Sequence, residues 1–275
     1  MIVLGGSSRQ SLAALRVALD NTLKGVSADD ASAISSGLFK ALVAIDSSTG
    51  LRRALTDSAR DASSKSDLVS DLFKKSLTGP VLALLANATS LRWSSPSGIA
   101  DAIEQIAVEA EATAANLGNS LDQVQSEIFT FSKLLIENPD LRTALSERAQ
   151  SPESKQALLK SIFGSKFSAS TNSLLSHSVE SRRARSIEKT IAAYSHAVTA
   201  RRNRVNAHIK SSIALSDVQA KKLADSLTKQ IGQPVHLNIE IDPSILGGIS
   251  IRFGDEVIDG TISNRLAEAS RALVS

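Results

Sequence analysis

Apolar residues recur every three or four positions through most of residues 1–204, which is the spacing of amphipathic α-helices. The first stripe runs from Leu12 to Leu23 and ends at Gly25. Ser27 and Asp30 then have the spacing of a capping box, which opens a second helix that extends to about Ile45. The pattern predicts further helices around residues 51–55, 65–73 and 78–91, followed by a break at residues 94–97.

This helical pattern repeats with a period of 90 residues. Residues 51–92 and 141–182 share 12 identities in 42 ungapped pairs, among them Lys65 with Lys155. The same offset places Phe39 on Phe129 further upstream. An offset that stays unbroken over this length indicates a duplicated helical unit.

The helix predicted after Pro96 matches two others. Shifted by 88 residues, its apolar positions fall on Ile187 and Ile191, in the last helix of the second unit. Shifted by 91 in the other direction, they fall on the stripe that begins at Leu12. We therefore expect one helix that ends the first bundle and begins the second.

The last 70 residues have the period of two that is typical of half-buried strands. This alternation predicts strands at 205–211, 235–241 and 249–253, with a short extension at 257–258. Helices are predicted from Ser216 to Gly232 and from 261 to 274. Four residues are predicted to form turns: Gly247, Gly248, Asp259 and Gly260.

The expected fold class is thus mainly α and α+β overall. Two tandem helical bundles that share a helix are followed by a small α/β C-terminal domain with a β-hairpin. The expected domains are an extra helical bundle at 1–98, a second helical bundle at 99–204 and the α/β domain at 205–275.

Composition narrows the function classes. The chain has 275 residues, 3% aromatic residues and no cysteine, which excludes disulfide scaffolds, zinc–thiolate sites and cysteine nucleophiles. The net charge of +3 implies no general polyanion-binding surface, although arginines cluster at 182–185 and 201–204. These clusters fit either a solvated face or a docking patch for acidic helices. No apolar run approaches the roughly 20 residues that span a bilayer, and the N-terminus lacks a signal-peptide pattern.

The motifs that carry chemistry in enzymes are missing from the sequence. Gly247-Gly248 lacks the remainder of a phosphate-binding loop and lies between predicted strands. Asp259 fits a turn or a helix cap better than a catalytic carboxylate. The four histidines do not have the spacing of a metal-ligand set. We therefore expect no catalytic residue, cofactor or metal, and a structural or interface role for the repeated pair Lys65 and Lys155.

The C-terminal residues carry a family resemblance. The segment 241–249, Ile-Asp-Pro-Ser-Ile-Leu-Gly-Gly-Ile, precedes Gly254-Asp255 and Val257-Ile258-Asp259-Gly260. Together with Asn138-Pro139-Asp140-Leu141-Arg142, this pattern resembles the delta subunit of F-type ATP synthases, whose mitochondrial counterpart is the oligomycin-sensitivity-conferring protein. The resemblance covers roughly residues 100–275, and residues 1–98 are additional to the usual pattern.

The resemblance implies a non-catalytic stator subunit, present once per complex on the cytoplasmic face of the bacterial plasma membrane and held there only through partners. Its helical domain would bind N-terminal helices of the alpha subunits, and its C-terminal domain would hold the membrane-anchored b subunits, so that rotor torque drives ATP synthesis. An alternative from the basic clusters is a helical adaptor for nucleic acid or another acidic partner. The sparse aromatic residues weaken the nucleic-acid reading.

Candidate contact residues follow from these expectations. A groove between two helices accepts a third amphipathic helix through apolar anchors. The candidates for the alpha helices are Leu12, Leu15, Leu19, Leu82 and Leu85 in the first unit, and Ile103, Ile106, Leu174 and Leu175 in the second. The same residues could instead be ordinary core positions. The candidates for the b subunits are Leu266, Leu273 and Val274.

Overall fold

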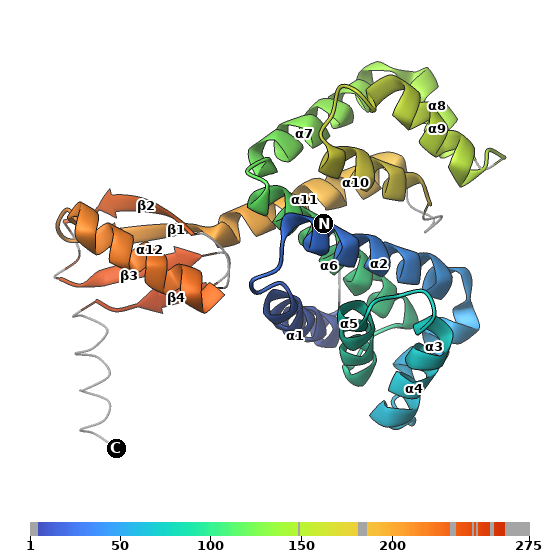
Figure 1. Cartoon of the computed structure of the whole chain (residues 1–275), viewed down its shortest axis with the longest axis horizontal. Coiled ribbons are helices and arrows are strands. Elements are labelled where there is room, and N and C mark those ends of the chain that lie inside the picture. Colours follow the sequence, from blue (N-terminus) through green and yellow to red (C-terminus); the bar gives the residue numbers. More distant parts are fainter. Residues whose placement is uncertain are drawn as a thin grey trace. The chain divides into compact units, whose positions relative to one another are not determined.

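A computed structural model describes residues 5–147, 149–180, 186–231, 235–243, 245, 247–253 and 256–261 (Figure 1). It divides into a helical unit, residues 1–199, and a smaller unit, residues 200–275, each described by itself. The helices are α1 (Gly6–Thr22), α2 (Ala28–Ser47), α3 (Thr49–Thr56), α4 (Ala62–Phe73), α5 (Gly79–Ser90), α6 (Pro96–Leu117), α7 (Leu121–Glu137), α8 (Pro139–Ser146), α9 (Pro152–Phe163), α10 (Ala169–Glu180), α11 (Ile187–Val205) and α12 (Asp217–Ile231). The strands are β1 (Asn206–Ser211), β2 (His236–Ile241), β3 (Ile249–Phe253) and β4 (Glu256–Asp259). The chain is thus mainly α and α+β overall, as predicted.

The duplication is visible in the helix bounds. Helices α3, α4 and α5 begin and end 90 residues before α8, α9 and α10, without a shift of a single residue. Helices α2 and α7 end 90 residues apart as well. Local signals explain several of these starts, because Ser27, Ser48 and Ser151 each accept a hydrogen bond from the backbone N–H three residues later.

Helix α6 occupies the centre of the helical unit. It packs against α1, α2, α3 and α5 on one side of the sequence and against α7 and α10 on the other. Sixteen of its 22 residues are buried, so almost no face of it meets solvent. We call α1–α6 bundle one and α6–α11 bundle two, and α6 is the helix that the two share.

Buried carboxylates tie α6 to bundle one. Glu109, only 1% exposed, accepts hydrogen bonds from the guanidinium of Arg16 on α1, with a shortest N–O distance of 2.7 Å. Glu111, also 1% exposed, accepts a hydrogen bond of 3.0 Å from the Ser32 hydroxyl on α2. Each of these buried carboxyl groups has a hydrogen-bond partner on bundle one, which burial of a polar group requires.

A ring cluster joins α2 of bundle one to bundle two. The Phe39 ring on α2 stacks on the imidazole of His177 on α10, with ring centroids 4.1 Å apart. The same ring lies 6.1 Å from that of Tyr194 on α11. Phe39 is 2% exposed, and contacts between α2 and α10 accompany the cluster. Phe39 therefore holds the two bundles together from a position within a predicted amphipathic helix.

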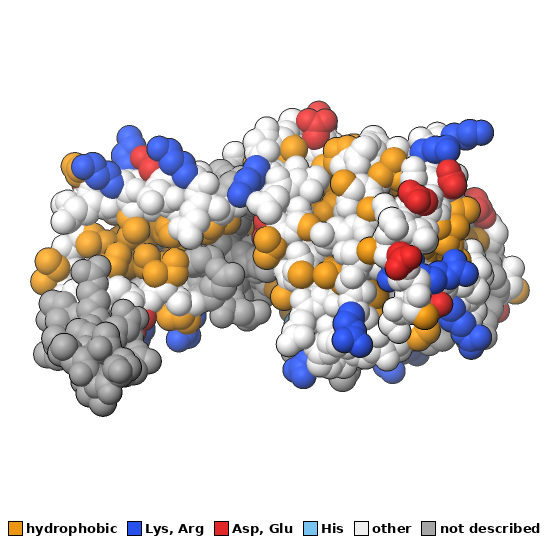
Figure 2. All heavy atoms as spheres, turned by 90° about the horizontal axis from the view of Figure 1, so that it is seen from below, with side chains coloured by type: hydrophobic (Ala, Val, Ile, Leu, Met, Phe, Trp, Pro, Cys, Tyr) orange, Lys and Arg blue, Asp and Glu red, His pale blue; other side chains and the backbone are white. Residues whose placement is uncertain are grey.

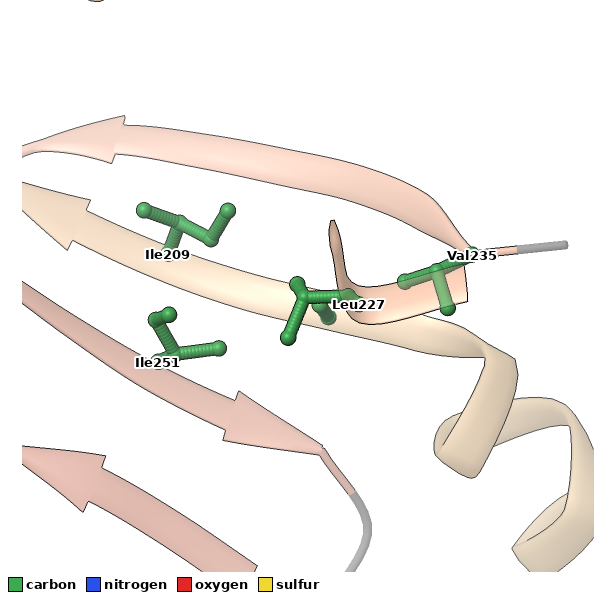
Figure 3. Packing of buried hydrophobic residues seen from close by; sticks show 5 residues of the cluster. Ile209, Leu227, Val235 and Ile251 are labelled. Carbon is green, nitrogen blue, oxygen red and sulfur yellow. The ribbon is translucent and has the colours of Figure 1, made fainter. Parts of the chain in front are cut away.

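The smaller unit contains a mixed four-stranded sheet in the order β2-β1-β3-β4. Strands β1 and β2 are parallel, and α12 forms the crossover between them, while β3 pairs antiparallel with both β1 and β4. A β-hairpin is present, as predicted for this domain, and β3 and β4 form it. Helix α12 lies across one face of the sheet (Figure 1). Its Leu227 packs with Ala207, Ile209, Val235 and Ile251 in a small buried core (Figure 3).

A glycine turn connects β2 to β3. Gly247 and Gly248 have φ values of 146° and 87°, which side chains other than hydrogen rarely allow. A Cβ atom on Gly248 would collide with the carbonyl oxygen of Gly260. Next to this point the Gly260 N–H donates to the Ile249 carbonyl, at 3.0 Å, and Asp259 accepts from the Thr261 N–H, also at 3.0 Å. The hydrogen bonds from Thr261 lower the pKa of Asp259.

The domain bounds 1–98, 99–204 and 205–275 remain a prediction about folding units. The chain divides into two compact units, and the boundary between them lies between Thr199 and Ala200, inside α11. A boundary at 98/99 would fall in the first turn of α6, which packs against helices on both sides of that point.

Candidate interaction surfaces

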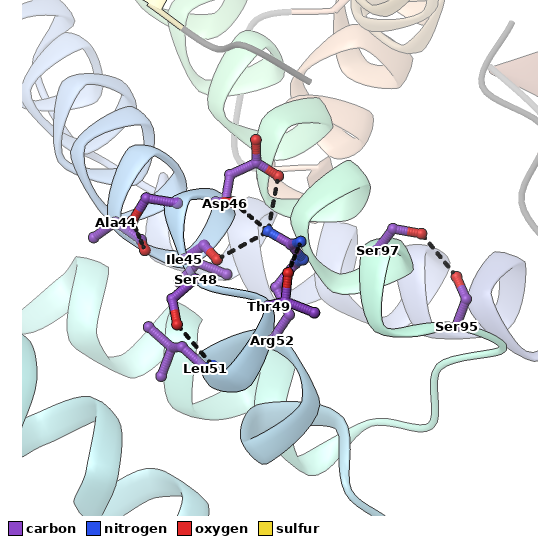
Figure 4. A network of polar contacts seen from close by, with 10 residues as sticks. Ala44, Ile45, Asp46, Ser48, Thr49, Leu51, Arg52, Ser95 and Ser97 are labelled. Carbon is purple, nitrogen blue, oxygen red and sulfur yellow. Dashed lines mark hydrogen bonds and ion pairs between the residues drawn. The ribbon is translucent and has the colours of Figure 1, made fainter. Parts of the chain in front are cut away.

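The repeats differ at the corner that follows α2 and α7. In bundle one, the guanidinium of Arg52 donates to the Ile45 and Asp46 carbonyls and to the Thr49 hydroxyl (Figure 4). In bundle two, the equivalent Arg142 lies 3.6 Å from the carboxylate of Glu188 at the start of α11. The same arginine therefore closes the α2–α3 corner in one repeat and links α8 to α11 in the other.

Glu127 fastens α7 to the start of α10. Its carboxylate accepts hydrogen bonds from the Ser168 backbone N–H, at 3.0 Å, and from the Ser168 hydroxyl, at 2.7 Å. Burial by itself would raise the pKa of Glu127, but hydrogen bonds from Thr171 and Ser168 outweigh it and lower the pKa. The equivalent residue in bundle one is Gly37, where a Cβ atom would lie 2.8 Å from a methyl carbon of Val81. The two bundles thus join the same helices by different chemistry.

The residues predicted to contact alpha-subunit helices lie in the bundle cores. Their helices are brought together as expected, because α1 packs on α5 and α6 packs on α10. All but one are at most 8% exposed, and Leu82 is partly buried. The buried members are Leu12, Leu15, Leu19, Leu85, Ile103, Ile106, Leu174 and Leu175. In this state of the chain their side chains support the helices of a groove rather than line its surface.

The two pairs of helices differ in what covers them. In bundle two, α2 packs against both α6 and α10, where Phe39 covers His177. Val108 on α6 is 1% exposed. In bundle one, the equivalent positions are bare, since Val17 on α1 is 58% exposed and Asn87 on α5 is exposed. The pair α1 and α5 therefore presents to solvent the side that α2 covers in the other repeat.

Large apolar side chains are also exposed outside α1. On α7, Phe129 and Ile136 are 68% and 72% exposed. On the smaller unit, hydrophobic side chains gather on the surface (Figure 2). The exposed large apolar residues of its strands are Ile239, Ile241, Val257 and Ile258. Neither group was singled out by the sequence pattern, although Phe129 is the repeat equivalent of the buried Phe39.

Several expectations fall elsewhere. The predicted b-subunit contacts Leu266, Leu273 and Val274, and the arginines at 182–185, lie outside the described residues. In the second arginine cluster, Arg201 is only 2% exposed, so it belongs neither to a solvated face nor to an open docking patch. Lys65 and Lys155 are both buried, and the Lys65 ammonium donates to the Asp57 carbonyl at 3.3 Å. Lys65 therefore makes a structural contact with the loop before α4.

The described residues lack two kinds of feature. They contain no group of three or more His, Asp and Glu side chains placed to hold a metal ion. Among the same residues, none of the helices combines the length and the apolar character needed to cross a bilayer.

Comparison with known proteins decides the family. The model of the family described as "ATP synthase delta (OSCP) subunit" matches residues 100–273. The chain belongs to the ATP synthase delta (OSCP) subunit family. The resemblance inferred from the C-terminal turns is thereby confirmed.

Relatives within this delta family extend over the whole chain. ATP synthase subunit delta of Streptomyces coelicolor is 37% identical over 270 residues, which cover 98% of each chain. The subunit delta of Streptomyces griseus is 36% identical, with 98% of this chain and 99% of the relative covered, and that of Thermobifida fusca is 36% identical over 268 residues. The family model begins at residue 100, near the start of α6, so α1–α5 precede it. The similarity to these relatives covers nearly the whole chain and therefore includes α1–α5 as well.

Proposed function

We propose that this delta-family chain is a non-catalytic stator subunit of a bacterial F-type ATP synthase. It links the alpha/beta hexamer to the membrane-anchored b subunits, so that rotor torque drives ATP synthesis. One copy acts per complex, on the cytoplasmic face of the plasma membrane, and partners alone hold it there. Membership of the family and near full-length similarity to named delta subunits support this role.

The proposed site for an alpha N-terminal helix is the outer side of α1 and α5. The observation that carries it is the covering of the equivalent pair, α6 and α10, by α2. A helix from a partner would take on α1 and α5 the place that α2 takes in bundle two. Val17, with Ala83 and Asn87, would contact it, and the predicted Leu12, Leu15, Leu19, Leu82 and Leu85 would support the two helices from within.

Bundle two cannot use its own equivalent pair in this way, because α2 already lies there. The predicted contacts Ile103, Ile106, Leu174 and Leu175 would then serve the internal joint. For the b subunits, we propose the C-terminal domain, including Leu266, Leu273 and Val274. This domain also exposes Ile239, Ile241 and Val257 on its sheet, and these side chains would add apolar surface for contact with the b subunits.

Binding of a synthetic N-terminal segment of the alpha subunit from the same organism tests the helix site. Val17→Asp should weaken binding at least tenfold, because it places a charge on the proposed contact while the side chain is 58% exposed in the free chain. The matched control is Leu72→Asp on α4, since Leu72 is 50% exposed and lies outside the proposed site. Equal affinities of the Val17 variant, the Leu72 variant and the unchanged chain would place the alpha helix elsewhere.

A further inference from the structure

A cavity of about 590 Å³ lies at one corner of bundle one. Its walls come from α3, from the loop that follows α3, and from the segment that leads into α6. Figure 4 shows the starts of α3 and α6, where Thr49 and Ser95 are labelled. The volume lies within the range of about 300–1,000 Å³ that is usual for small-molecule sites. The charged and aromatic residues of the lining are Arg53, Asp57, Arg60 and Trp93.

The duplication shows that the fold itself produces a cavity at this corner. Bundle two has one of about 460 Å³ between α8 and the start of α11, the helices equivalent to α3 and α6. Two glutamates, Glu147 and Glu188, line it together with Arg142, which lies 3.6 Å from the Glu188 carboxylate. Thr143 takes the place of Arg53 there. The cavity of bundle one therefore differs from its repeat in the charge of its lining.

Arg53 supplies an unpaired cation to the cavity of bundle one. Within the part of the chain that the structure describes, its guanidinium has neither a carboxylate nor another hydrogen-bond acceptor as partner. Arg60 adds a second guanidinium, 3.8 Å from the Asp57 carboxylate, and both of these side chains are about half exposed. The N-terminus of α6 adds positive charge from the helix dipole. Two guanidinium groups against one carboxylate favour an anion, and their planar sets of donors match a phosphate group.

Trp93 gives the same cavity an ordered aromatic wall. Its indole N–H donates to the Ala88 carbonyl at 2.8 Å, and the residue is half-buried. A Cβ atom on Gly98 would lie 3.5 Å from a carbon of the ring, so the first turn of α6 packs against the indole. A ring that is already held in place can stack on a nucleobase with little further loss of side-chain entropy.

We propose that this cavity binds a nucleoside phosphate, with the phosphates on Arg53 and Arg60 and the base on Trp93. Guanidinium groups that pair with phosphate and an aromatic face that stacks on a base are together the chemistry that recognises such a molecule. The site belongs to bundle one, since the equivalent cavity of bundle two has Thr143 in place of Arg53 and two carboxylates in its lining. This inference goes beyond the stator function and does not depend on it.

Titration of the full-length chain with ADP tests the proposal. Trp93 is the single tryptophan, so its fluorescence reports on the proposed site, and calorimetry gives the affinity independently. We expect saturable binding of ADP that quenches Trp93 and weakens as the salt concentration rises. Arg53→Thr, which introduces the residue of the other repeat, should weaken ADP binding by about tenfold. The matched control is Lys133→Thr on α7, which removes an exposed cation outside the cavity and should leave the affinity unchanged.

Inorganic phosphate and adenosine, titrated separately, test the two halves of the ligand, and each should bind more weakly than ADP. Three results would overturn the proposal: no saturable binding at millimolar ADP, equal ADP affinities of the Arg53 and Lys133 variants, or either half binding as tightly as ADP. Arg60→Gln provides a second variant, and thermal melts followed by circular dichroism verify that every variant is folded. None of these results bears on the stator function, which is tested by retention of the chain in the synthase.

Discussion

Removal of the Phe39 ring is the sharpest perturbation of the helical unit. Truncation of a buried phenylalanine to alanine costs about 3–5 kcal/mol of unfolding free energy. Phe39 is 2% exposed and contacts two rings, so a loss of about 4 kcal/mol is expected for Phe39→Ala. For a unit of this size, each kcal/mol shifts the melting temperature by about 2–4 °C. The variant should melt about 10 °C below the unchanged chain.

The duplication supplies a control of the same chemistry. Phe129→Ala removes the same atoms from the equivalent position, but that ring is 68% exposed. The free energy of unfolding should then change by less than about 0.5 kcal/mol. Circular dichroism follows the helices in both variants, and the fluorescence of Trp93, the single tryptophan, reports on bundle one.

Two results would refute the reasoning. If both variants lost equal stability, Phe39 would not hold the bundles together. If Phe129→Ala were the more destabilised, the assignment of buried and exposed repeats would be reversed. A double-mutant cycle with His177→Ala isolates the stacked pair, for which a coupling of about 0.5–1.5 kcal/mol is expected.

Two further predictions concern single contacts. Hydrogen bonds lower the folded pKa of Glu127 below the ordinary glutamate value of 4.5, which applies in the unfolded chain. The contribution of Glu127 to stability is therefore complete above the unfolded pKa and is lost as the pH falls through the folded pKa. Glu127→Gln should therefore cost about 1–3 kcal/mol at pH 7 and much less at pH 3 in urea titrations, and a cost independent of pH would contradict this. Gly248→Ala should destabilise the smaller unit by about 1–3 kcal/mol, because the new Cβ meets the Gly260 carbonyl at a positive φ. Hydrogen exchange of the strands measures this, Gly6→Ala is the open-space control, and equal protection in both variants would rule out the strain.

The periodic part of the fold could be predicted from the sequence. The 3.6-residue spacing and the 90-residue offset located the helices and the duplication, since both are recorded locally along the chain. The alternation of apolar residues located β1, β2 and β3 in the same way. Gly247 and Gly248 marked the turn between β2 and β3, and this turn is part of the segment that carries the family resemblance.

Burial of equivalent residues could not be predicted in this way. Phe39 and Phe129 occupy the same place in the same pattern, and only the neighbouring bundle makes one a core residue. Glutamate is usually a solvent-facing residue, yet Glu109 and Glu111 are buried, with hydrogen bonds from Arg16 and Ser32 inside the unit. The strand order β2-β1-β3-β4 depends on pairings between distant residues, which no local period records. For the same reason, the contact residues predicted from the sequence are core residues of α1 and α5, and the exposed Val17 on the outer side was not among them.

The stator role has one direct test. The tagged chain is expressed at its natural level, the synthase is extracted from membranes in mild detergent, and the intact complex is weighed by native mass spectrometry. The account predicts one copy of this chain in a complex that contains alpha and b subunits, and loss of the alpha–b connection when the chain is removed. A synthase that retains this connection without the chain, or a chain recovered apart from the synthase, would contradict it.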